Sequence, residues 1–272
     1  MQRIMTIRTL LPTMATAAAL ACQYYRRNDR QAVRSKSDET IVTQADSAVE
    51  ALLRQAIRQQ FGPVNIVGEE GEKHYDASLP YTFVIDPIDG TAVFANGAPA
   101  WAICVGLLNH RLQPVAGIVS APCWGSLFVA DVDPRSSVLC NGTPLPAMEP
   151  SQTQNVDSQT TILVDSKLFH THQVHDFPGK CRCFGSTALH ICLVAQQCGF
   201  ALAHACPVYA WDIAAAHAIA QRVGLTVQCL NGQPLVYADL LPDQRTPAPI
   251  IAAAPATLAA IAPLIVERRG GV

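Results

Sequence analysis

The residues best suited to chemistry form one short run in the first third of the chain, where an apolar segment ends in two carboxylates, a glycine and a hydroxyl. Residues 81–85 are rich in β-branched and aromatic side chains, which predicts a buried strand with Asp86 at its carboxyl end. Asp89 follows, and Gly90 and Thr91 are expected to open a short helix whose unpaired N–H groups favour a phosphate. Two acids are suitable ligands for a divalent cation. The run therefore indicates metal-assisted phosphate chemistry, with an ordinary Asp-Pro and Asp-Gly turn as the alternative.

Four further acids lie at the ends of predicted elements rather than on helix faces. Apolar residues recur at helical spacing over residues 47–61, and a short strand is predicted at residues 65–67. A second helix is predicted at residues 213–223. The acids at these ends are Asp46, Glu69, Glu70 and Asp212. Each has a plainer explanation, because adjacent glutamates are common in solvated loops and an acid in a first turn suits the helix dipole.

The order of elements predicts two halves of different kinds, an α+β half followed by an α/β half. Apolar strands at residues 100–108, 114–121 and 126–131 form a meander, which needs no helix between its strands. A stretch rich in Pro, Ser and Thr over residues 141–161 is the expected domain boundary, and we place the division between residues 149 and 150. Beyond it strands and helices alternate, which favours a layered α/β half. The expected strands are at residues 161–165, 198–204, 225–230, around 237 and at 250–252, and the expected helices are at 188–197, 213–223 and 256–266.

Composition excludes several classes of protein. A formal net charge of −2 and the lack of any long basic run argue against a nucleic-acid partner, so a small molecule is expected. No apolar run reaches about 18 residues, so no membrane-spanning segment is predicted. Residues 10–22 faintly resemble a secretory or lipoprotein signal ending at Cys22, but we favour an amphipathic helix that continues to residue 27. The 10 cysteines include no CxxC pair, which indicates reduced thiols in a cytoplasmic protein.

Five motifs in this chain, in the same order, closely resemble those of the inositol monophosphatase family. Members of that family are lithium-sensitive, magnesium-dependent phosphomonoesterases that share a superfamily with fructose-1,6-bisphosphatase. The resemblance implies a layered αβαβα sandwich with sub-domains at residues 1–149 and 150–272, and a homodimer. The motifs are Lys36-x-Asp38-x-Thr40-x-Val42-Thr43-x-Ala45-Asp46, Gly68-Glu69-Glu70, Asp86-Pro87-Ile88-Asp89-Gly90-Thr91-x-x-Phe94, Gly185-Ser186-Thr187-Ala188 and Trp211-Asp212-x-Ala214-Ala215.

The resemblance also implies a set of magnesium ligands. The ligands implied for a first Mg²⁺ ion are Glu69, Asp86 and the main-chain carbonyl of Ile88. Those implied for a second ion are Asp86, Asp89 and Asp212, so that Asp86 bridges the two. Glu70 matches a residue that contacts the outer shell or a third ion. A set of hard oxygen ligands without Cys or His fits Mg²⁺ rather than zinc.

Other positions are implied to act on water and on the substrate. Thr91 and Asp46 resemble a hydroxyl and carboxylate pair that orients the attacking water, assisted by Glu69. The main-chain N–H groups of Gly90 and Thr91 would hold the phosphate. Further substrate contacts are implied for Gly185, Ser186, Thr187 and Asp212. The scheme needs no covalent intermediate, because a metal lowers the pKa of bound water far enough to make a nucleophile near neutral pH.

The departures from the family pattern concern the substrate. Inositol-specific members carry a glutamate where this chain has Ala205. Residues 98–101 and 119–122 resemble the histidinol-phosphate phosphatase branch, although that branch's usual replacement for the Gly-Ser-Thr segment is absent. Inositol monophosphate is the leading expectation. The alternatives are histidinol phosphate, fructose 1,6-bisphosphate, a 3′-phosphoadenosine nucleotide, or a catalytically weak homologue kept as a binding or regulatory protein.

Three kinds of side chain have ordinary explanations beside functional ones. His170, His172 and His175 lie close together, but their spacing fits no standard zinc finger, so we expect a solvated loop. Trp211, next to an implied ligand, is expected to pack rather than to bind substrate. Cys206 is either a contact to the departing group or filler, and the sequence leaves both open.

Overall fold

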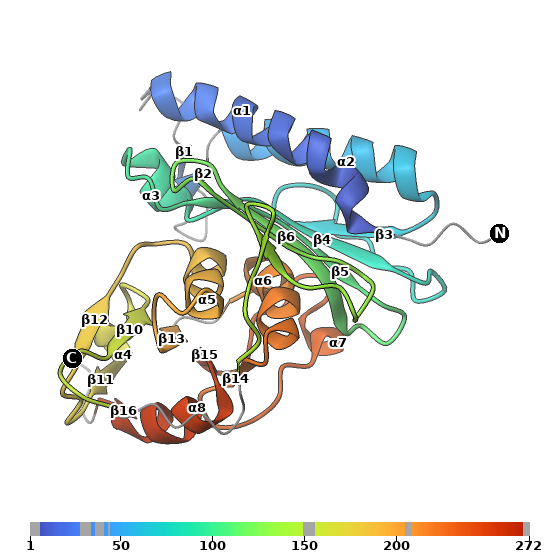
Figure 1. Ribbon diagram of the computed structural model, residues 1–272. Helices are drawn as coiled ribbons and strands as arrows, with labels where there is room; N and C mark the ends of the chain where they lie inside the picture. The colour runs from blue at the N-terminus through green and yellow to red at the C-terminus, as the bar shows by residue number, and fades with distance from the viewer. Residues whose placement is uncertain are drawn as a thin grey trace.

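Five layers stack on one another in the computed structural model of the protein (Figure 1). Helices α1 and α2 cover one face of a seven-stranded sheet, and helices α5 and α6 lie between its other face and a five-stranded sheet. Helix α8 lies beyond the second sheet. The predicted αβαβα sandwich is therefore confirmed. The structure describes residues 6–27, 34–35, 41–42, 44–148, 156–204 and 208–268.

The outer layer consists of α1 (Leu11–Arg27) and α2 (Gln44–Phe61), which lie side by side. A 3₁₀ turn, η1 (Ile7–Leu10), leads into α1. Pro12 lies in the first turn of α1, where its missing N–H breaks no helical hydrogen bond. The amphipathic helices predicted here are confirmed, and each turns an apolar stripe toward the sheet. The buried residues of these stripes include Leu10, Met14, Ala17 and Ala21 from η1 and α1, and Val49, Leu53 and Ile57 from α2.

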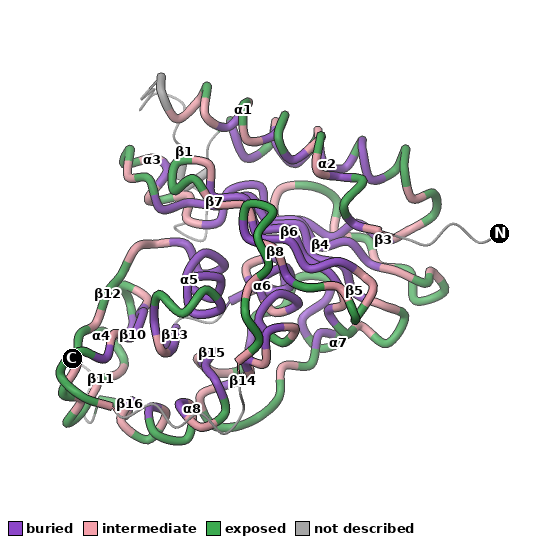
Figure 2. The backbone as a smooth tube through the Cα atoms, in the orientation of Figure 1, coloured by how far each residue is buried: buried purple, intermediate pink, exposed green. Residues whose placement is uncertain are grey.

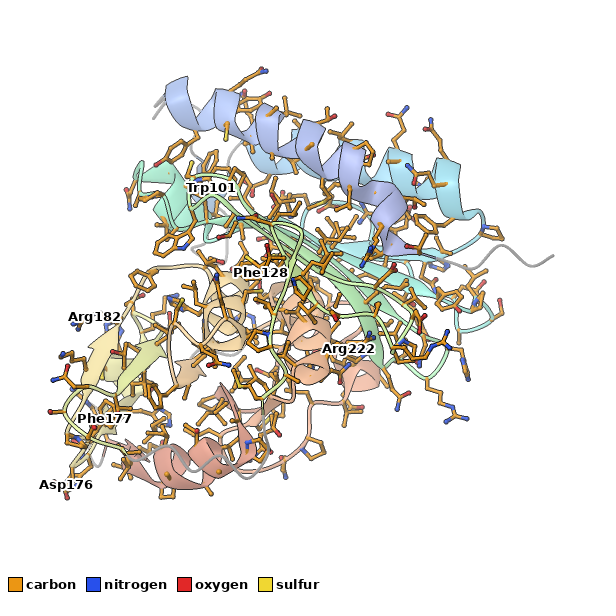
Figure 3. The ribbon with its side chains drawn as sticks, viewed as in Figure 1. Trp101, Phe128, Asp176, Phe177, Arg182 and Arg222 are labelled. Carbon is orange, nitrogen blue, oxygen red and sulfur yellow. The ribbon has the colours of Figure 1, made fainter. Side chains whose placement is uncertain are left out.

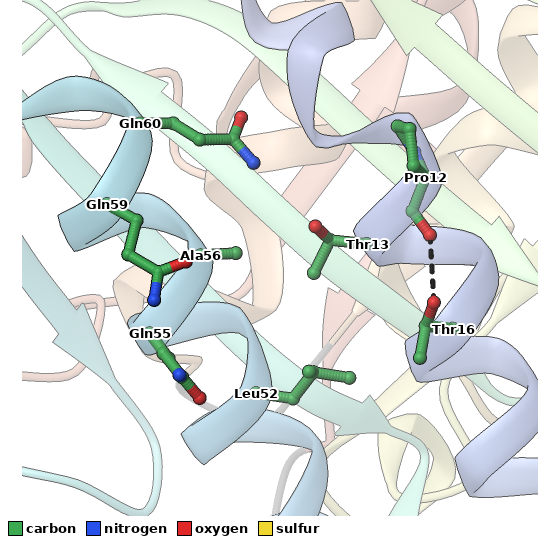
Figure 4. A pocket seen from close by; sticks show the side chains of 8 residues that line it. All are labelled: Pro12, Thr13, Thr16, Leu52, Gln55, Ala56, Gln59 and Gln60. Carbon is green, nitrogen blue, oxygen red and sulfur yellow. Dashed lines mark hydrogen bonds between the residues drawn. The ribbon is translucent and has the colours of Figure 1, made fainter.

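A pocket of about 300 Å³ lies between α1 and α2 (Figure 4). Because these helices cover the face of the first sheet that is turned away from α5 and α6, the pocket lies on the opposite side of that sheet from α5 and α6. It is lined by Pro12, Thr13 and Thr16 of α1 and by Leu52, Gln55, Ala56, Gln59 and Gln60 of α2.

The first sheet is buried on both faces along most of its length (Figure 2). Its first two strands are parallel and all later neighbours are antiparallel, so the predicted meander is confirmed. A short helix, α3 (Thr91–Ala95), follows the second strand. In spatial order the strands are β3 (Asn65–Gly68), β4 (Thr82–Asp89), β5 (Ala102–Leu108), β6 (Pro114–Ala121), β7 (Ser126–Ala130), β8 (Leu139–Cys140) and β9 (Thr143–Pro144).

Helix α6 (Ala210–Arg222) lies very close to the first sheet because two glycines of β5 and β6 face it. A Cβ added at Gly106 would lie 2.8 Å from the Cβ of Ala214. A Cβ added at Gly117 would overlap the main-chain carbonyl of Ala215. The absence of side chains at these two points lets the helix backbone rest on the sheet.

The far end of α6 is fixed to the rim of the first sheet by Arg222 (Figure 3). Its guanidinium donates hydrogen bonds to four main-chain carbonyls rather than pairing with one carboxylate. The acceptors are the carbonyls of Asp133 (2.7 Å), Asp131 (3.1 Å), Val115 (3.3 Å) and Ser136 (3.4 Å).

The second sheet is mixed, with three parallel strands at one side. In spatial order its strands are β12 (Lys180–Arg182), β10 (Thr161–Val164), β13 (Ala201–His204), β15 (Ile250–Ala253) and β14 (Thr226–Cys229). The first three are parallel, and β15 is antiparallel to both of its neighbours. Helix α5 (Thr187–Ala195) packs between the two sheets, and α8 (Pro255–Ile261) covers the far face. This half alternates strands and helices as predicted.

Four expectations about local structure are wrong. Asp86 lies inside β4 rather than at its end, because pairing with β5 resumes at Asp89 beyond the interruption that Pro87 causes. Tyr237 begins a short helix, α7 (Tyr237–Leu240), rather than a strand, since its buried ring packs in the core. The last helix ends at residue 261, where a 3₁₀ turn containing Pro263 leads into a strand.

The segment with three histidines is the fourth correction, since it is structured rather than a loop. It forms α4 (Leu168–Thr171) and β11 (His172–Val174), and β11 pairs with β16 (Ile265–Glu267). The histidines form no metal-binding group among the residues that the structure describes.

Several expectations fall on residues outside those described. They include the proposed division between residues 149 and 150, residues 36–40 and 43 of the first motif, Ala205 and Cys206. The domain division stays a prediction. Among the described helices, none is both long enough and apolar enough to span a bilayer. All nine cysteines in the described part of the chain are free thiols.

Candidate metal centre

Strand β4 brings Asp86 and Asp89 to the same face of the first sheet. In a regular strand these two residues would point to opposite faces, because successive side chains alternate. A shift of register between them changes this, so that Asp86 pairs with Cys104 and Asp89 pairs with Ala102 on β5. Cys104 and Ala102 both belong to the core beside α5 and α6, whereas Ile88 is buried under α1 and α2. Both carboxylates therefore face the inner helix layer.

Helix α6 supplies a third carboxylate, Asp212, from its first turn. Its position is fixed by the close packing of α6 on the sheet and by a hydrogen bond of 2.7 Å from the main-chain N–H of Tyr209. One oxygen each of Asp86, Asp89 and Asp212 lies within 4.8 Å of the others. These three are the only group of His, Cys, Asp or Glu residues so arranged within the described ranges. Three of the implied metal ligands are thus brought together, and we call them the carboxylate cluster.

Burial makes the cluster electrostatically costly when it is ionised. Burial raises the pKa of Asp86 well above its ordinary value, and the charges of Glu69, Asp89 and Asp212 raise it further. Burial also raises the pKa of Asp212 to about 7, with a further contribution from the charge of Asp89. The pKa of Asp89 rises to about 6 because of burial, although hydrogen bonds to its carboxylate oppose the rise. Without a counter-charge these acids hold protons at a pH where exposed aspartates have lost them.

The cluster fits a hard divalent cation. Oδ1 of Asp86 is buried and has no hydrogen-bond partner among the described residues. A buried acceptor oxygen without a donor is unfavourable unless something positive meets it. All the donor atoms are carboxylate oxygens, which are the ligands preferred by Mg²⁺ and Ca²⁺ rather than by zinc. Asp86, Asp89 and Asp212 could therefore hold a metal ion.

The N-terminus of α5 meets the cluster at Asp89. The carboxylate of Asp89 accepts hydrogen bonds from the Ser186 hydroxyl at 2.5 Å, from the Thr187 N–H at 3.2 Å and from the Ala188 N–H at 2.6 Å. Ser186 is the N-cap of α5, and its side chain also accepts from the Leu189 N–H. The Gly-Ser-Thr segment implied to contact substrate thus lies beside the cluster. Its role in substrate binding stays a prediction.

The turn after β4 is made possible by Gly90, whose φ of 91° lies in the left-handed region. The position of a Cβ at Gly90 would be 3.4 Å from the Ser186 main-chain nitrogen, so this turn also lies against α5. The next residue, Thr91, begins α3 and its hydroxyl donates to the carbonyl of Ile88 at 3.0 Å. The implied ligand carbonyl and the implied water-orienting hydroxyl are therefore neighbours. Pairing of Thr91 with Asp46 stays a prediction.

Two further acids lie within electrostatic reach of the cluster. Glu69 is partly buried just after β3, and its charge raises the pKa of Asp86. Asp46 is buried in the first turn of α2 and raises the same pKa more weakly. Trp211, next to Asp212, is buried and stacks on Tyr209 with a centroid distance of 4.4 Å, as expected of a packing residue.

Sequence reasoning missed the pair that holds the loop of Glu69 and Glu70 in place. The carboxylate of Glu50 on α2 accepts from the N–H groups of Glu70 at 2.8 Å and Gly71 at 2.7 Å. It also pairs with Arg54 at 2.6 Å. Arg54 in turn donates to two main-chain carbonyls, those of Ile66 and Glu72, both at 3.0 Å. A signal was present, because this i, i+4 pair of opposite charges lies on the buried side of α2.

Comparison with known proteins agrees with this geometry. The sequence profile of the inositol monophosphatase family matches residues 6–267. A histidinol-phosphatase of Chlorobaculum parvum is 29% identical over 76% of this chain and 79% of its own length. Inositol monophosphatase 1 of Homo sapiens is 26% identical over 80% of this chain and 81% of its own. The solved structure of the Thermotoga maritima IMPase superposes with a TM-score of 0.79 at 20% identity, covering 95% of each chain. The chain belongs to the inositol monophosphatase family of phosphatases.

Proposed function

We propose that this protein hydrolyses the phosphate monoester of a small polyol, sugar or related alcohol in a Mg²⁺-dependent reaction. The observation that carries the proposal is the carboxylate cluster, in which oxygens of two buried acids and one partly buried acid lie within 4.8 Å of one another. Oδ1 of Asp86 in this cluster is buried and has no hydrogen-bond partner among the described residues. Like charges buried together repel, so the cluster is expected to ionise fully only with cations bound. Membership of a phosphatase family supports the same chemistry.

Two or three Mg²⁺ ions are part of the proposal. The residues proposed to hold them are Glu69, Asp86, the carbonyl of Ile88, Asp89 and Asp212, with Glu70 in an outer position. When bound, the metal supplies positive charge for the phosphate oxygens and lowers the pKa of a bound water.

The remaining groups of this chain are proposed to bind and orient the reactants. The Thr91 hydroxyl donates to Ile88, which leaves its oxygen able to accept a hydrogen bond from the attacking water. The carboxylates of Asp46 and Glu69 would orient the same water and attract its proton. The N–H groups of Gly90 and Thr91 would hold phosphate oxygens. Gly185, Ser186 and Thr187 would border the departing alcohol, since Ser186 and Thr187 lie against Asp89 and Ser186 lies against Gly90.

Inositol monophosphate is the first substrate to test, because of the family to which the chain belongs. Histidinol phosphate is the second, since one relative is named for that activity. Fructose 1,6-bisphosphate and 3′-phosphoadenosine nucleotides complete the set. A homodimer and a cytoplasmic location are further parts of the proposal.

Phosphate release from these four esters, with Mg²⁺ and with EDTA, tests the proposal. We expect release from at least one ester with Mg²⁺ and none with EDTA. Release that is equal in EDTA would contradict the metal-dependent mechanism. If metal binds but no ester is cleaved, the protein is instead the binding or regulatory homologue.

A further inference from the structure

A second group of polar side chains lies where the three parallel strands of the second sheet end. Asp165 follows β10, Cys183 follows β12, and His204 is the last residue of β13. Register places Val164 opposite Ala203, and the Asp165 N–H donates to the Ala203 carbonyl, so Asp165 and His204 lie at the same level of the sheet. His190 of α5 completes the group, which we call the edge cluster. The carboxyl ends of parallel strands are where α/β sheets bind ligands.

Asp165, His190 and His204 are mostly buried and lie within electrostatic reach of one another, whereas Cys183 is exposed. Nε2 of His204 lies 3.8 Å from Oδ1 of Asp165, and the two side chains are 11% and 13% exposed. Nε2 of His190 accepts a hydrogen bond of 2.9 Å from the Phe184 N–H, so His190 is neutral with its proton on Nδ1. Burial lowers the pKa of His190 to about 4, and the neighbouring charge of His204 acts in the same direction. Partial burial of its sulfur raises the pKa of Cys183, and the charge of Asp165 raises it further.

The chain leads directly from the edge cluster to the carboxylate cluster. Only Phe184 and Gly185 separate Cys183 from Ser186, whose hydroxyl is 2.5 Å from Asp89. Figure 3 shows Arg182 at the end of β12 that is nearer to the first sheet, whereas Phe177 lies at the far end. The edge on which the polar groups gather is therefore the one turned toward the metal centre.

The chemistry of the edge cluster excludes two other roles. Its ligand atoms do not converge as those of Asp86, Asp89 and Asp212 do, so it is no metal site among the described residues. It also does not suit a second phosphate, because it presents the carboxylate of Asp165 and a neutral His190. The nearest cations in sequence, Lys167 and Arg182, are exposed.

An aromatic surface lies beside these polar groups. The ring of Phe184 is 5.7 Å from that of His190 and 5.1 Å from that of Trp124, which is 37% exposed. A carbon frame can rest on such rings while its polar groups reach the neighbouring acceptors and donors.

We infer that Asp165 and His204 bind the alcohol part of the phosphate ester, and that they select an alcohol bearing hydroxyl or protonated amine groups over one bearing a second phosphate. This inference rests on the proposed function. The carboxylate of Asp165 accepts hydrogen bonds from hydroxyl and ammonium groups and repels a phosphate, and the imidazole of His204 can form a hydrogen bond with a hydroxyl group.

Replacement of each residue by a neutral analogue tests the inference. The quantity measured is kcat/KM for the best ester of the panel divided by kcat/KM for p-nitrophenyl phosphate. This ratio should fall about tenfold in Asp165→Asn and in His204→Gln, mainly through KM, since one hydrogen bond to a charged group is lost. The matched control is His175→Gln, which alters an exposed His–Asp pair at the far end of β11 and should leave the ratio unchanged.

A third variant tests the inference even if Asp165→Asn and His204→Gln fail to fold. Cys183 is exposed, so Cys183→Arg adds a cation at the edge without repacking the core. Cys183→Arg should raise kcat/KM for fructose 1,6-bisphosphate severalfold relative to kcat/KM for the best monophosphate ester. The control is Cys198→Arg, at another exposed position beyond the other end of α5, which should leave this ratio unchanged. Unchanged ratios in an active protein overturn the inference alone. If the wild-type protein cleaves no ester, the proposed function is overturned and the inference with it.

Discussion

Asp89 has two sets of partners, since its carboxylate belongs to the cluster and also accepts the hydrogen bonds of Ser186 and α5. Asp89→Asn removes the charge but keeps the shape and one acceptor oxygen. We expect turnover to fall about 100-fold or more, because a metal ligand is weakened. The thermal midpoint of the metal-free protein should stay equal or rise, because repulsion of Asp212 is relieved. Phosphate release and thermal melting in EDTA measure the two effects.

The control for this variant is Asp176→Asn, which removes an exposed acid that pairs with its neighbour His175 far from the cluster. Its turnover and its thermal midpoint in EDTA should equal those of the wild-type protein. Near-normal turnover in Asp89→Asn would contradict the assignment of Asp89 as a ligand.

The raised pKa values of Asp89 and Asp212, about 6 and about 7, predict how stability depends on pH. The folded metal-free protein holds protons that the unfolded chain has released above about pH 4, so its free energy of unfolding should fall as pH rises from about 4 to 7. Each unit of pKa shift corresponds to about 1.4 kcal/mol per group. Because Mg²⁺ requires ionised ligands, the rise in thermal midpoint on adding Mg²⁺ should grow over the same range.

His190 provides an internal check because its pKa, lowered to about 4, gives the opposite sign. Its contribution to stability is present above about pH 6.5 and is lost as pH falls toward 4. The difference between melting with Mg²⁺ and with EDTA at each pH removes this contribution, which is common to both. A difference that does not change between about pH 5 and 8 would contradict the coupling of metal to protons.

Among the elements, α2 is expected to control metal binding without touching metal. Arg54→Met leaves the carboxylate of Glu50 buried without its ion-pair partner, and the hold on the loop of Glu69 and Glu70 weakens. Loss of one partner of a buried pair destabilises a protein by about 3–5 kcal/mol. The Mg²⁺ concentration that gives half-maximal activity should rise about tenfold. Arg58→Met, on the exposed side of the same helix, is the control and should change neither quantity.

The close contact between α6 and the first sheet is expected to contribute to stability. Gly117→Ala would place a Cβ against the rigid backbone of Ala215, so we expect a loss of about 2 kcal/mol or more in the free energy of unfolding, measured with urea. Gly199→Ala is the matched control, because the added carbon would meet the side chain of Leu163 at 3.1 Å, which can move. Equal stability of the two variants would show that the backbone contact is looser than described.

For the whole molecule, we expect unfolding in a single transition. One apolar core includes residues of both sheets and both inner helices, for example Val84 and Leu202. Trp101 is buried in the first half and Trp211 in the second. Urea melts followed by fluorescence in Trp101→Phe and Trp211→Phe should coincide with each other and with the far-ultraviolet circular dichroism. Separate transitions would show that the predicted sub-domains unfold independently.

Much of this architecture could be predicted from the sequence because its signals are local. Helical spacing identified α1 and α2, and apolar runs identified the meander, since both patterns follow from burying one face or two. The acids of the cluster were found because each lies at an element end or in a motif. The sequence therefore predicts all three acids of the cluster, Asp86, Asp89 and Asp212.

The features that sequence reasoning missed depend on contacts between distant parts of the chain. Pro87 indicated the end of a strand, but pairing across the bulge continues β4 to Asp89. Tyr237 has high strand propensity, yet packing places it in a helix. The i, i+4 spacing of Glu50 and Arg54 within the apolar stripe of α2 indicates a buried pair, but only the fold shows that it fixes the loop of Glu69.

Helix α6 is held at both ends: Arg222 donates hydrogen bonds to the rim carbonyls of the first sheet, and Asp212 belongs to the carboxylate cluster. Thirteen residues span about 20 Å, and the two glycines beneath them leave little room for sideways slip. A displacement of Arg222 at the rim is therefore expected to move Asp212 at the other end of the helix. Occupancy of the ion site and the integrity of that rim must be thermodynamically linked.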